Sequence, residues 1–305
     1  MMIKKSLAHR QLIALKKRGH LNSHESQYLR YLNLGYEGEF SFSNNFDRIM
    51  SKFCTTIHDF RFIINGSERQ IDTLAIFNNK IILFEVKNYN GNLVFRDNNF
   101  YTYKTNRLLK SPIQQIHDTG DKFTQLLNQL NYSIPIEKYV IFLNNNFHLF
   151  NAPIDEMIVT NAQLPAFLEN LKKNNFPLKS HANSIKQRIL MCYNETTRQC
   201  DVNYTFNTIN KGIFCRIDGE KLVENGHEKY ICKQCGSFYH QKDIIIEVIQ
   251  DFQCLFPDEK VTYKNIYDFT DGRISYYKLR KIMNRYYERI GTSRMVYFVD
   301  KEHDH

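Results

Sequence analysis

Two runs rich in β-branched and aliphatic residues, 70–77 and 80–88, lie on either side of Asn78 and Asn79. Because asparagine tolerates the positive φ angles that a two-residue turn requires, the pattern predicts a β-hairpin. Counting outward from this turn, Phe77 pairs with Lys80 and Asp72 lies opposite Glu85. The aliphatic residues on the same face are expected in the core: Leu74, Ile76, Ile81 and Leu83.

The spacing of apolar residues predicts the remaining elements. Further strands are expected at 53–65, 92–104, 137–143, 157–160 and 295–299, with a hairpin turn near 97–99. Helices are expected at 3–20, 24–52 (one or two), 112–130, 164–173, 183–192, 243–256, 263–269 and 275–287. Strands followed by alternating helices and strands predict an α/β fold in which helices flank a mixed sheet.

The hairpin gathers charged side chains at the end of its apolar face. Lys87 follows Glu85 by two residues and therefore shares a face with Glu85 and Asp72. Opposed side chains in an antiparallel pair have Cβ atoms ~4.5–5.5 Å apart, so two carboxylates there repel unless a cation lies between them. Mg²⁺ prefers such oxygen ligands. The alternative is a solvated ion cluster at an ordinary hairpin end.

Four blocks of sequence around this hairpin carry a resemblance: Gly35–Glu39 (GYEGE), Gln70–Asp72 (QID), Phe84–Tyr89 (FEVKNY) and Ser111–Gln115 (SPIQQ). Asp72, twelve intervening residues and Glu85-Val86-Lys87 resemble the core of the PD-(D/E)xK nuclease superfamily. Taken together, the blocks resemble the nuclease-related domain (NERD) family over roughly residues 30–170. Ser111 departs from the asparagine expected in that family. The resemblance implies a restriction-endonuclease-like core.

The resemblance also implies a metal-dependent reaction at the hairpin. Asp72, Glu85 and the carbonyl of Val86 are expected to bind Mg²⁺ or Mn²⁺. Lys87 is expected to orient the attacking water and to offset developing negative charge. The expected activity is hydrolysis of DNA phosphodiester bonds. The alternative is a catalytically inactive nuclease fold that acts as a nucleic-acid-binding or adaptor protein.

Two further residues match positions of the family. Glu39 matches a helical glutamate and is expected at the metal, with Glu37 as its near competitor. Gln115, on the helix that begins at Pro112, matches the family's glutamine and is expected to reach the same site. The alternative for Gln115 is a plain surface amide.

Six of the seven cysteines follow residue 190, and three of these form a motif with one aspartate: Cys215, Asp218, Cys232 and Cys235. A Cys-x2-Cys pair followed by glycine places two thiolates on one tetrahedral ion, so the segment resembles a degenerate zinc ribbon that binds structural Zn²⁺. His240 or His227 is the alternative fourth ligand. The other alternative is a ribbon that has lost its metal.

The net charge of +9 favours a polyanionic partner, and DNA is the first candidate. No apolar run approaches the ~18–20 residues that span a bilayer, so no membrane insertion is expected. The first twenty residues lack the apolar stretch of a signal peptide, which together with the odd cysteine count predicts a cytoplasmic protein. The sequence leaves the oligomeric state open.

Basic and aromatic residues interleave near the C-terminus: Tyr276, Tyr277, Lys278, Arg280, Lys281 and Arg285. This combination suits phosphate contacts and base stacking, and the surrounding helices predict a small helical, winged-helix-like module that binds nucleic acid. The alternative is that the tyrosines pack a core beneath a solvated charged face.

The sequence predicts five segments along the chain. They are a basic helical segment at 1–29, a nuclease-like domain at 30–173, a linker at 174–210, a zinc-ribbon-like segment at 211–240 and a C-terminal DNA-binding-like module at 241–305.

Overall fold

The computed structural model describes residues 3–154, 157–195, 198–226, 228–292 and 296–301. By their contacts these residues form two compact units: unit 1 takes its residues from Met1–Lys4 and Tyr31–Thr196, and unit 2 from Lys5–Arg30 and Thr197–His305. No helix among the described residues is both long enough and apolar enough to cross a bilayer. The predicted division of the chain into five segments stays a prediction.

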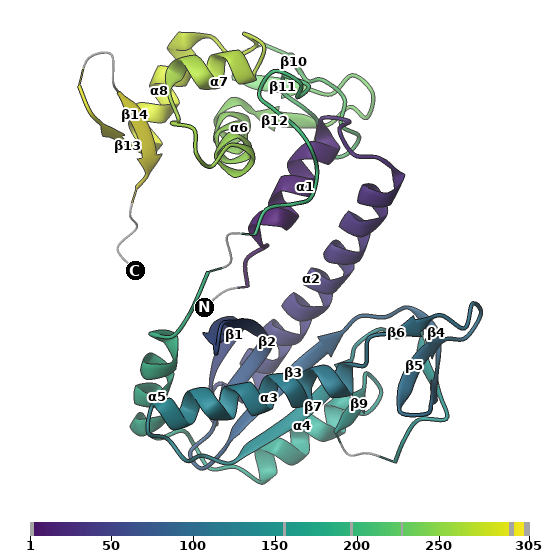
Figure 1. The fold of residues 1–305 in the computed structure, drawn as a ribbon. Helices are drawn as coiled ribbons and strands as arrows, with labels where there is room; N and C mark the ends of the chain where they lie inside the picture. The colour runs from purple at the N-terminus through teal and green to yellow at the C-terminus, as the bar shows by residue number, and fades with distance from the viewer. Residues whose placement is uncertain (1–2, 155–156, 196–197, 227, 293–295, 302–305) are drawn as a thin grey trace. The chain divides into compact units, whose positions relative to one another are not determined.

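A mixed five-stranded sheet with the strand order β1-β2-β3-β7-β9 forms the centre of unit 1 (Figure 1). The strands are β1 (Thr55–Ile64), β2 (Ser67–Ile76), β3 (Ile81–Lys87), β7 (Ile136–Phe142) and β9 (Ile158–Thr160). The first three run antiparallel through tight turns, whereas β3, β7 and β9 are parallel. The parallel neighbours β3 and β7 are joined by a helical crossover, α3 (Pro112–Gln129), whereas the connection from β7 to β9 contains a short strand of a second sheet, and α4 (Leu164–Lys173) follows β9. The predicted mixed sheet flanked by helices is confirmed.

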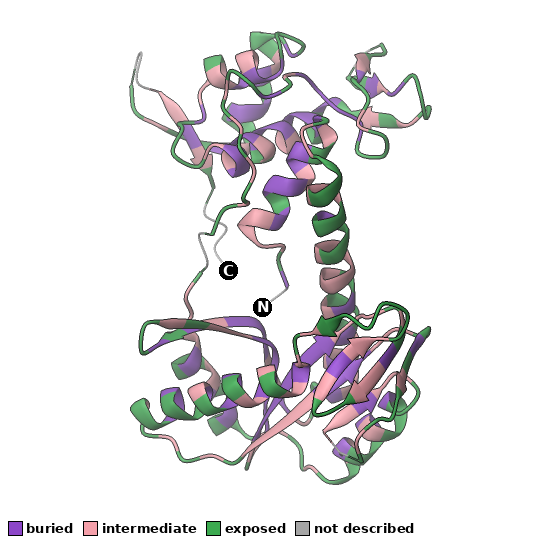
Figure 2. Ribbon diagram, turned by 45° about the vertical axis from the view of Figure 1, so that its right-hand side comes forward, coloured by how far each residue is buried: buried purple, intermediate pink, exposed green. Residues whose placement is uncertain are grey.

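Helices cover both faces of this sheet. On one face, α2 (Ser23–Met50) and α4 pack against Phe77, Phe84 and Ile141. On the other face, α3 and α5 (Ser180–Leu190) pack against a cluster that includes every aliphatic residue predicted for the inner face of the hairpin. Figure 2 shows the buried residues of these helices alternating with exposed ones.

Helix α2 approaches the end of β3 closely, and Gly38 permits this. A Cβ atom on Gly38 would lie 2.7 Å from the Cβ of Asn88, well inside the normal contact distance. The Asn88 side chain donates to the Leu34 carbonyl of α2 at 2.9 Å and accepts a hydrogen bond from Asn144 at 3.1 Å. These contacts join α2 to the segment that follows Lys87.

A second, four-stranded sheet in unit 1 has the order β6-β5-β4-β8. Its strands are β4 (Gly91–Arg96), β5 (Asn99–Thr102), β6 (Leu108–Leu109) and β8 (Phe147–Phe150). The hairpin between β4 and β5 turns at Asp97 and Asn98, both at positive φ, as the sequence predicts. The strands β6 and β8 were not predicted, because two and four residues are too few for a periodic signal.

One continuous core holds unit 2 together. It joins α1 (Leu7–Lys17) to the cysteine-containing segment and to α6 (Gln241–Leu255), α7 (Tyr263–Phe269) and α8 (Tyr276–Tyr286). The basic helix α1 is therefore a packed element: Lys17 pairs with Glu247 at 2.6 Å and with Asp251 at 2.9 Å. The Arg18 guanidinium, 2% exposed, lies 4.0 Å from the centre of the Phe269 ring.

The C-terminal part of unit 2 has the element order of a winged helix. After α6, a bridge from Val261 to Phe298 ties the chain to the last hairpin, and α7 and α8 follow as a helix-turn-helix pair. The hairpin of β13 (Tyr287–Ile290) and β14 (Tyr297–Asp300) stands in the place of the wing. The described residues contain the predicted small helical module, and its identity as a winged helix stays a prediction. Part of the predicted strand 295–299 lies outside the described residues, and β13 was not predicted.

We expect Gly38→Ala and Gly35→Ala to change stability in opposite directions. An alanine methyl at residue 38 forces α2 away from Asn88, which costs about 1–3 kcal/mol. A Cβ on Gly35 meets nothing closer than Glu39 Oε1 at 4.0 Å, so its replacement gains about 0.5–1 kcal/mol of helix propensity. Chemical denaturation of the two variants measures both effects, and equal shifts would show that the Asn88 contact does not limit the helix.

Candidate active site and cysteine cluster

The predicted hairpin register is confirmed from its turn to the edge of the site. The Phe77 N–H donates to the Lys80 carbonyl at 2.9 Å, and the ladder continues to the pair Thr73–Phe84. The same count places Asp72 opposite Glu85, one row beyond the last paired residues.

The ladder between β1 and β2 is also interrupted at Asp72. Pairing is present on both sides of a row formed by Asp59 and Asp72, but that row itself is unpaired, and Asp59 has a φ of 49°. On both strands, odd-numbered residues face the core on one side of this row and even-numbered residues face it on the other side, as at a bulge on each strand. Irregular backbone of this kind occurs next to active sites because it re-aims side chains. The flanking pairs are His58–Thr73 and Phe60–Ile71.

Side chains replace the missing ladder bonds around Asp72. The Val86 N–H donates to Asp72 Oδ2 at 2.8 Å, so the carboxylate is fixed against β3 and its other oxygen is left for a further partner. On the same strand, Lys87 Nζ makes a short ion pair with Glu85 Oε1 and lies 3.5 Å from Gln115 Oε1 of α3. Asp72 and Glu85 are 7% and 3% exposed. The structure thus brings Asp72, Glu85, Lys87 and Gln115 together.

Ser111 takes part in positioning Gln115. Its hydroxyl accepts a hydrogen bond from the Gln114 N–H at 3.3 Å and so caps α3, with Pro112 in the first turn. Serine and asparagine both serve as helix caps, so the departure from the family pattern leaves the start of this helix intact.

Glu39 reaches the same cluster from α2. It lies on the helix face that buries Phe42 and Phe46, whereas Glu37 is exposed. Burial raises the pKa of the Glu39 carboxyl to about 9, and the nearby charges of Asp72, Asp59 and Glu85 act in the same direction. The structure therefore brings Glu39, rather than Glu37, to the site.

The site holds more buried carboxyl groups than cations. Burial, followed by the charge of Asp72, raises the pKa of Glu85 to about 7, and burial likewise raises the pKa of Asp72. Burial disfavours the charged form of Lys87, but Glu85 and Asp72 outweigh it and raise the lysine pKa. Protons thus compensate part of the negative charge in the isolated chain. An all-oxygen donor set with surplus negative charge fits a hard divalent cation.

Four residues near the site were not among the predicted site residues. Asp59 lies nine-tenths buried beside Asp72, and Arg61 pairs with it at 3.0 Å. Burial raises the pKa of the Tyr89 phenol, which senses the charges of Lys87 and Glu85. The charge of Lys110 also acts on Glu85. The signal for Asp59 was present: Asn65-Gly66 is a strong hairpin turn, and counting outward from it places Asp59 opposite Asp72.

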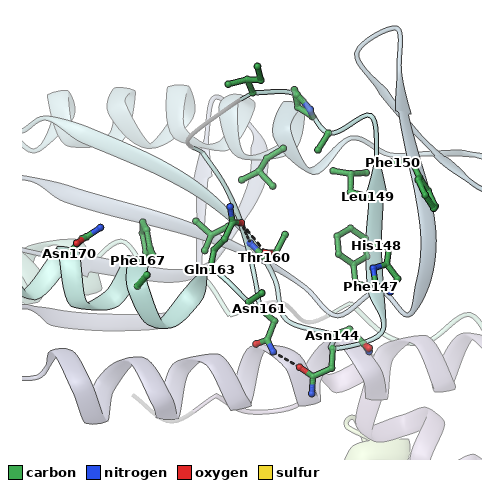
Figure 3. A pocket seen from close by; sticks show the side chains of 18 residues that line it. Asn144, Phe147, His148, Leu149, Phe150, Thr160, Asn161, Gln163, Phe167 and Asn170 are labelled. Atoms are coloured by element: carbon green, nitrogen blue, oxygen red, sulfur yellow. Dashed lines mark hydrogen bonds between the residues drawn. The ribbon is translucent and has the colours of Figure 1, made fainter.

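A cavity of about 1070 Å³ lies beside this site rather than in it. It is lined by the residues that follow β7 and β9 and by one side of α4 (Figure 3). Among the described residues that line it, only His148 has an ionisable side chain.

In unit 2 the structure brings four side chains of the cysteine-containing segment together: Cys215, Asp218, Cys232 and Cys235. Their ligand atoms all lie within 4.8 Å of one another. Cys215 Sγ is 3.6 Å from Cys235 Sγ, and Cys232 Sγ is 3.2 Å from Asp218 Oδ2. This cluster could hold a metal ion and is compatible with a zinc-ribbon-like segment.

The two halves of this cluster are equivalent turns. In each turn the N–H of a positive-φ glycine, Gly219 or Gly236, donates to the carbonyl of the preceding cysteine four residues back. Asp218 therefore stands where the second cysteine of the first turn would be. The Glu220 N–H donates to its carboxylate and lowers the Asp218 pKa to about 2, so the side chain is an anion at neutral pH. His240 is not part of the group, and His227 lies outside the described residues.

The predicted nucleic-acid-binding residues lie together on α8, but several already have partners within unit 2. Lys278 pairs with Glu224, and Lys281 pairs with Glu228 at 2.8 Å. Tyr276 stacks on Tyr267 with ring centres 4.4 Å apart. Four of the predicted residues, joined by Asn284, line a shallow depression: Tyr277, Arg280, Lys281 and Arg285.

An acidic row beside Glu85-Val86-Lys87, on a mixed sheet flanked by helices, defines a nuclease-like α/β domain. Residues 34–143 match the family model described as nuclease-related domain, so the chain contains a domain of this family. Searches of curated proteins and of solved structures gave no significant match.

We expect the metal-free protein to lose stability between about pH 5 and pH 9. The unfolded chain releases its glutamate protons near pH 4.5, whereas the folded chain holds those of Glu85 and Glu39 to about pH 7 and 9. The folded state therefore binds more protons across this window, and stability falls as pH rises. Lys87 stays charged over this pH range and therefore does not contribute to the change of stability with pH.

Denaturation in EDTA at several pH values measures this loss. Glu39→Gln should remove a slope of about 1 kcal/mol per pH unit in part of the window, whereas the exposed control Glu37→Gln should leave it unchanged. Identical slopes for the wild type and Glu39→Gln would contradict the argument.

Proposed function

We propose that the protein is a divalent-metal-dependent nuclease that hydrolyses DNA phosphodiester bonds at the site formed by Asp72, Glu85 and Lys87. The observation that carries this proposal is the surplus of buried carboxyl groups beside a single lysine. Such a cluster is unfavourable in the isolated chain, and a hard cation together with a phosphate would balance it.

The Asp72 and Glu85 carboxylates, with the carbonyl of Val86, would hold Mg²⁺ or Mn²⁺. Asp72 suits this role because its hydrogen bond from Val86 fixes its orientation and leaves Oδ1 for the ion. A cation bound there supplies Lewis-acid polarisation of the scissile phosphate and a more acidic water. Glu39 would contribute through the water layer around the ion.

Lys87 acts as a cation rather than as a base in this proposal. Its pKa is raised by Glu85 and Asp72 despite burial, so the ammonium group keeps its proton at neutral pH. It therefore holds a phosphate oxygen or the attacking water and offsets negative charge in the transition state. Gln115, 3.5 Å from Lys87 Nζ, restricts the position of the ammonium group.

We expect purified protein to cut plasmid and linear single-stranded DNA with Mg²⁺ or Mn²⁺ and not with EDTA. Asp72→Asn and Lys87→Ala should each lower the rate by about 10²–10³-fold, because each removes one fixed charge at the reacting phosphate. Glu39→Gln should also lower the rate, whereas Glu37→Gln, an exposed neighbour on the same helix, serves as the matched control.

Two outcomes contradict this proposal. The first is no cleavage with either metal. The second is cleavage that is unchanged by Asp72→Asn and Lys87→Ala. DNA binding that survives Asp72→Asn without any cleavage would assign the chain to the class of inactive nuclease folds that act as binding or adaptor proteins.

We further propose that the winged-helix-like module contacts DNA through the exposed side of α8, with Tyr277, Arg280 and Arg285. The support is the position of α8 as the second helix of a helix-turn-helix pair and the depression on its surface. The ion pairs of Lys278 and Lys281 reduce their value for phosphate contacts, because each pair must open before the lysine binds DNA.

The cysteine cluster is proposed as a structural Zn²⁺ site with the ligands Cys215, Asp218, Cys232 and Cys235. Three sulfur donors and one carboxylate in two matching turns suit tetrahedral zinc. Cys215 and Cys232 are fully buried in the core of unit 2, so ion binding and the packing of that core are coupled.

We expect one zinc ion per chain by elemental analysis. Cys232→Ser should abolish zinc retention, and Asp218→Ala should weaken it because it removes the only carboxylate ligand. His240→Ala is the matched control and should retain zinc. Loss of zinc in the His240 variant, with retention in the Asp218 variant, would reverse the assignment of the fourth ligand.

A further inference from the structure

One face of the small sheet in unit 1 carries partly and largely exposed side chains. The register places one row across all four strands: Leu108, Tyr101, Val94 and Phe150. The opposite face, with Leu93, Phe95 and Phe100, packs into the core. Figure 2 shows most of the segment 91–110 as intermediate or exposed.

Aromatic rings dominate the outer face. Phe150 is 45% exposed and packs against Tyr103, itself 58% exposed, with ring centres 5.2 Å apart. Leu108, at the other end of the row, is also 58% exposed. Phe150 is also one of the residues that line the cavity of Figure 3, so its ring lies at the edge between the outer face and that cavity. Phe150 and Tyr103 thus form a tilted and largely exposed aromatic pair, whereas the Phe147 ring on the other face of β8 stacks on Phe142 in the core.

The segment that carries Tyr103 also carries exposed basic residues. Lys104, Arg107 and Lys110 are exposed, and within the described part of the chain none of the three makes an ion pair or a side-chain hydrogen bond. Arg96 lies over the Tyr101 ring, 4.7 Å from its centre. The segment 91–110 contains four basic residues and one acidic residue, Asp97 at the β4–β5 turn, so the segment has a net positive charge. This differs from α8, where two lysines are already paired.

The chain connects this face directly to the candidate active site. The segment β4–β6 lies between Lys87, at the end of β3, and Ser111, which caps the helix that carries Gln115. At the end of the segment, the charge of Lys110 acts on Glu85. A polyanionic strand bound at the reacting carboxylates would therefore meet Lys110 and then the aromatic face.

We propose that the outer face of β4–β6 and β8 binds an unpaired stretch of the substrate strand, whose bases stack on Tyr103 and Phe150. This proposal deepens the proposed nuclease function and rests on it for the identity of the substrate. Exposed aromatic rings on an open sheet, with cations to track the backbone, are how proteins hold single-stranded nucleic acid. Bases of an intact duplex are already stacked and cannot reach the rings, so the face selects single-stranded or locally opened DNA.

The experiment measures binding without cleavage. Fluorescence anisotropy with a labelled oligothymidylate in EDTA compares the wild type with the double variant Tyr103→Ala/Phe150→Ala. We expect a loss of affinity on the order of tenfold or more. Binding of a duplex of the same length should be unchanged. The matched control is Phe176→Ala, which removes an 81% exposed ring elsewhere in unit 1 and should bind as the wild type.

The contribution of the basic residues is measured separately, from the salt dependence of DNA affinity. Lys104→Ala/Arg107→Ala should lower the slope of log affinity against log salt by about 1.4, since each phosphate contact on a single strand contributes about 0.7. Lys173→Ala/Arg188→Ala removes two exposed charges away from the face and should leave the slope unchanged.

Cross-linking separates this face from α8. An oligothymidylate that carries 5-bromodeoxyuridine is irradiated with the full chain, and the attached peptides are identified by mass spectrometry. Attachment at Tyr103 or Phe150 supports the proposal. Attachment confined to Tyr276 or Tyr277 overturns it, as does equal binding by the wild type and the Tyr103/Phe150 variant.

Cleavage by the wild type and single-strand binding by the Tyr103/Phe150 variant together test the binding face and the nuclease activity separately. If the wild type cuts DNA but the Tyr103/Phe150 variant binds and cuts single strands normally, the face is not the binding surface and the nuclease assignment stands. If no metal supports cleavage but the variant loses single-strand affinity, the face binds nucleic acid in a protein that does not cut it.

Discussion

The burial of several carboxyl groups at one point of a sheet is the constraint on which the architecture of unit 1 depends. Glu39, Asp59, Asp72 and Glu85 lie on four elements, α2 and β1–β3, and each is largely shielded from water. Protons, Lys87 and Arg61 compensate their charge in the isolated chain. A buried cluster of this kind is costly without compensating charge, and this cost supports the proposed cation site.

The sheet accommodates this cluster because its regular backbone pairing is interrupted at the row of Asp72. Neither ladder of β2 is paired at Asp72, and the Val86 N–H turns to its carboxylate instead of to backbone. The stability lost at that row is recovered in the apolar layers on both sides of the sheet. Gly38 and Asn88 then hold α2, and with it Glu39, against the end of β3. The site is thus positioned by packing that lies outside it.

The parts of this site that depend on local sequence patterns could be predicted from the sequence. The Asn78-Asn79 turn fixes the register of β2 on β3, because a shift of one residue would expose the buried face of the hairpin. Asp59 was not predicted, although Asn65-Gly66 encodes its position just as directly. The small strands β6 and β8 have no such local signal, since their pairing depends on residues far along the chain.

Charge distribution explains how an acidic site can belong to a protein that carries a net charge of +9. A polyanion approaching Glu85 is repelled by the buried carboxylates, so attraction must come from cations that are not neutralised within the protein. Lys110, Arg107 and Lys104 meet this condition, because they are exposed and unpaired within the described residues and continue from the site along one segment. The lysines of α8 do not, since Glu224 and Glu228 already bind them. These contrasts support the proposal that the small sheet brings a nucleic acid strand to the carboxylates.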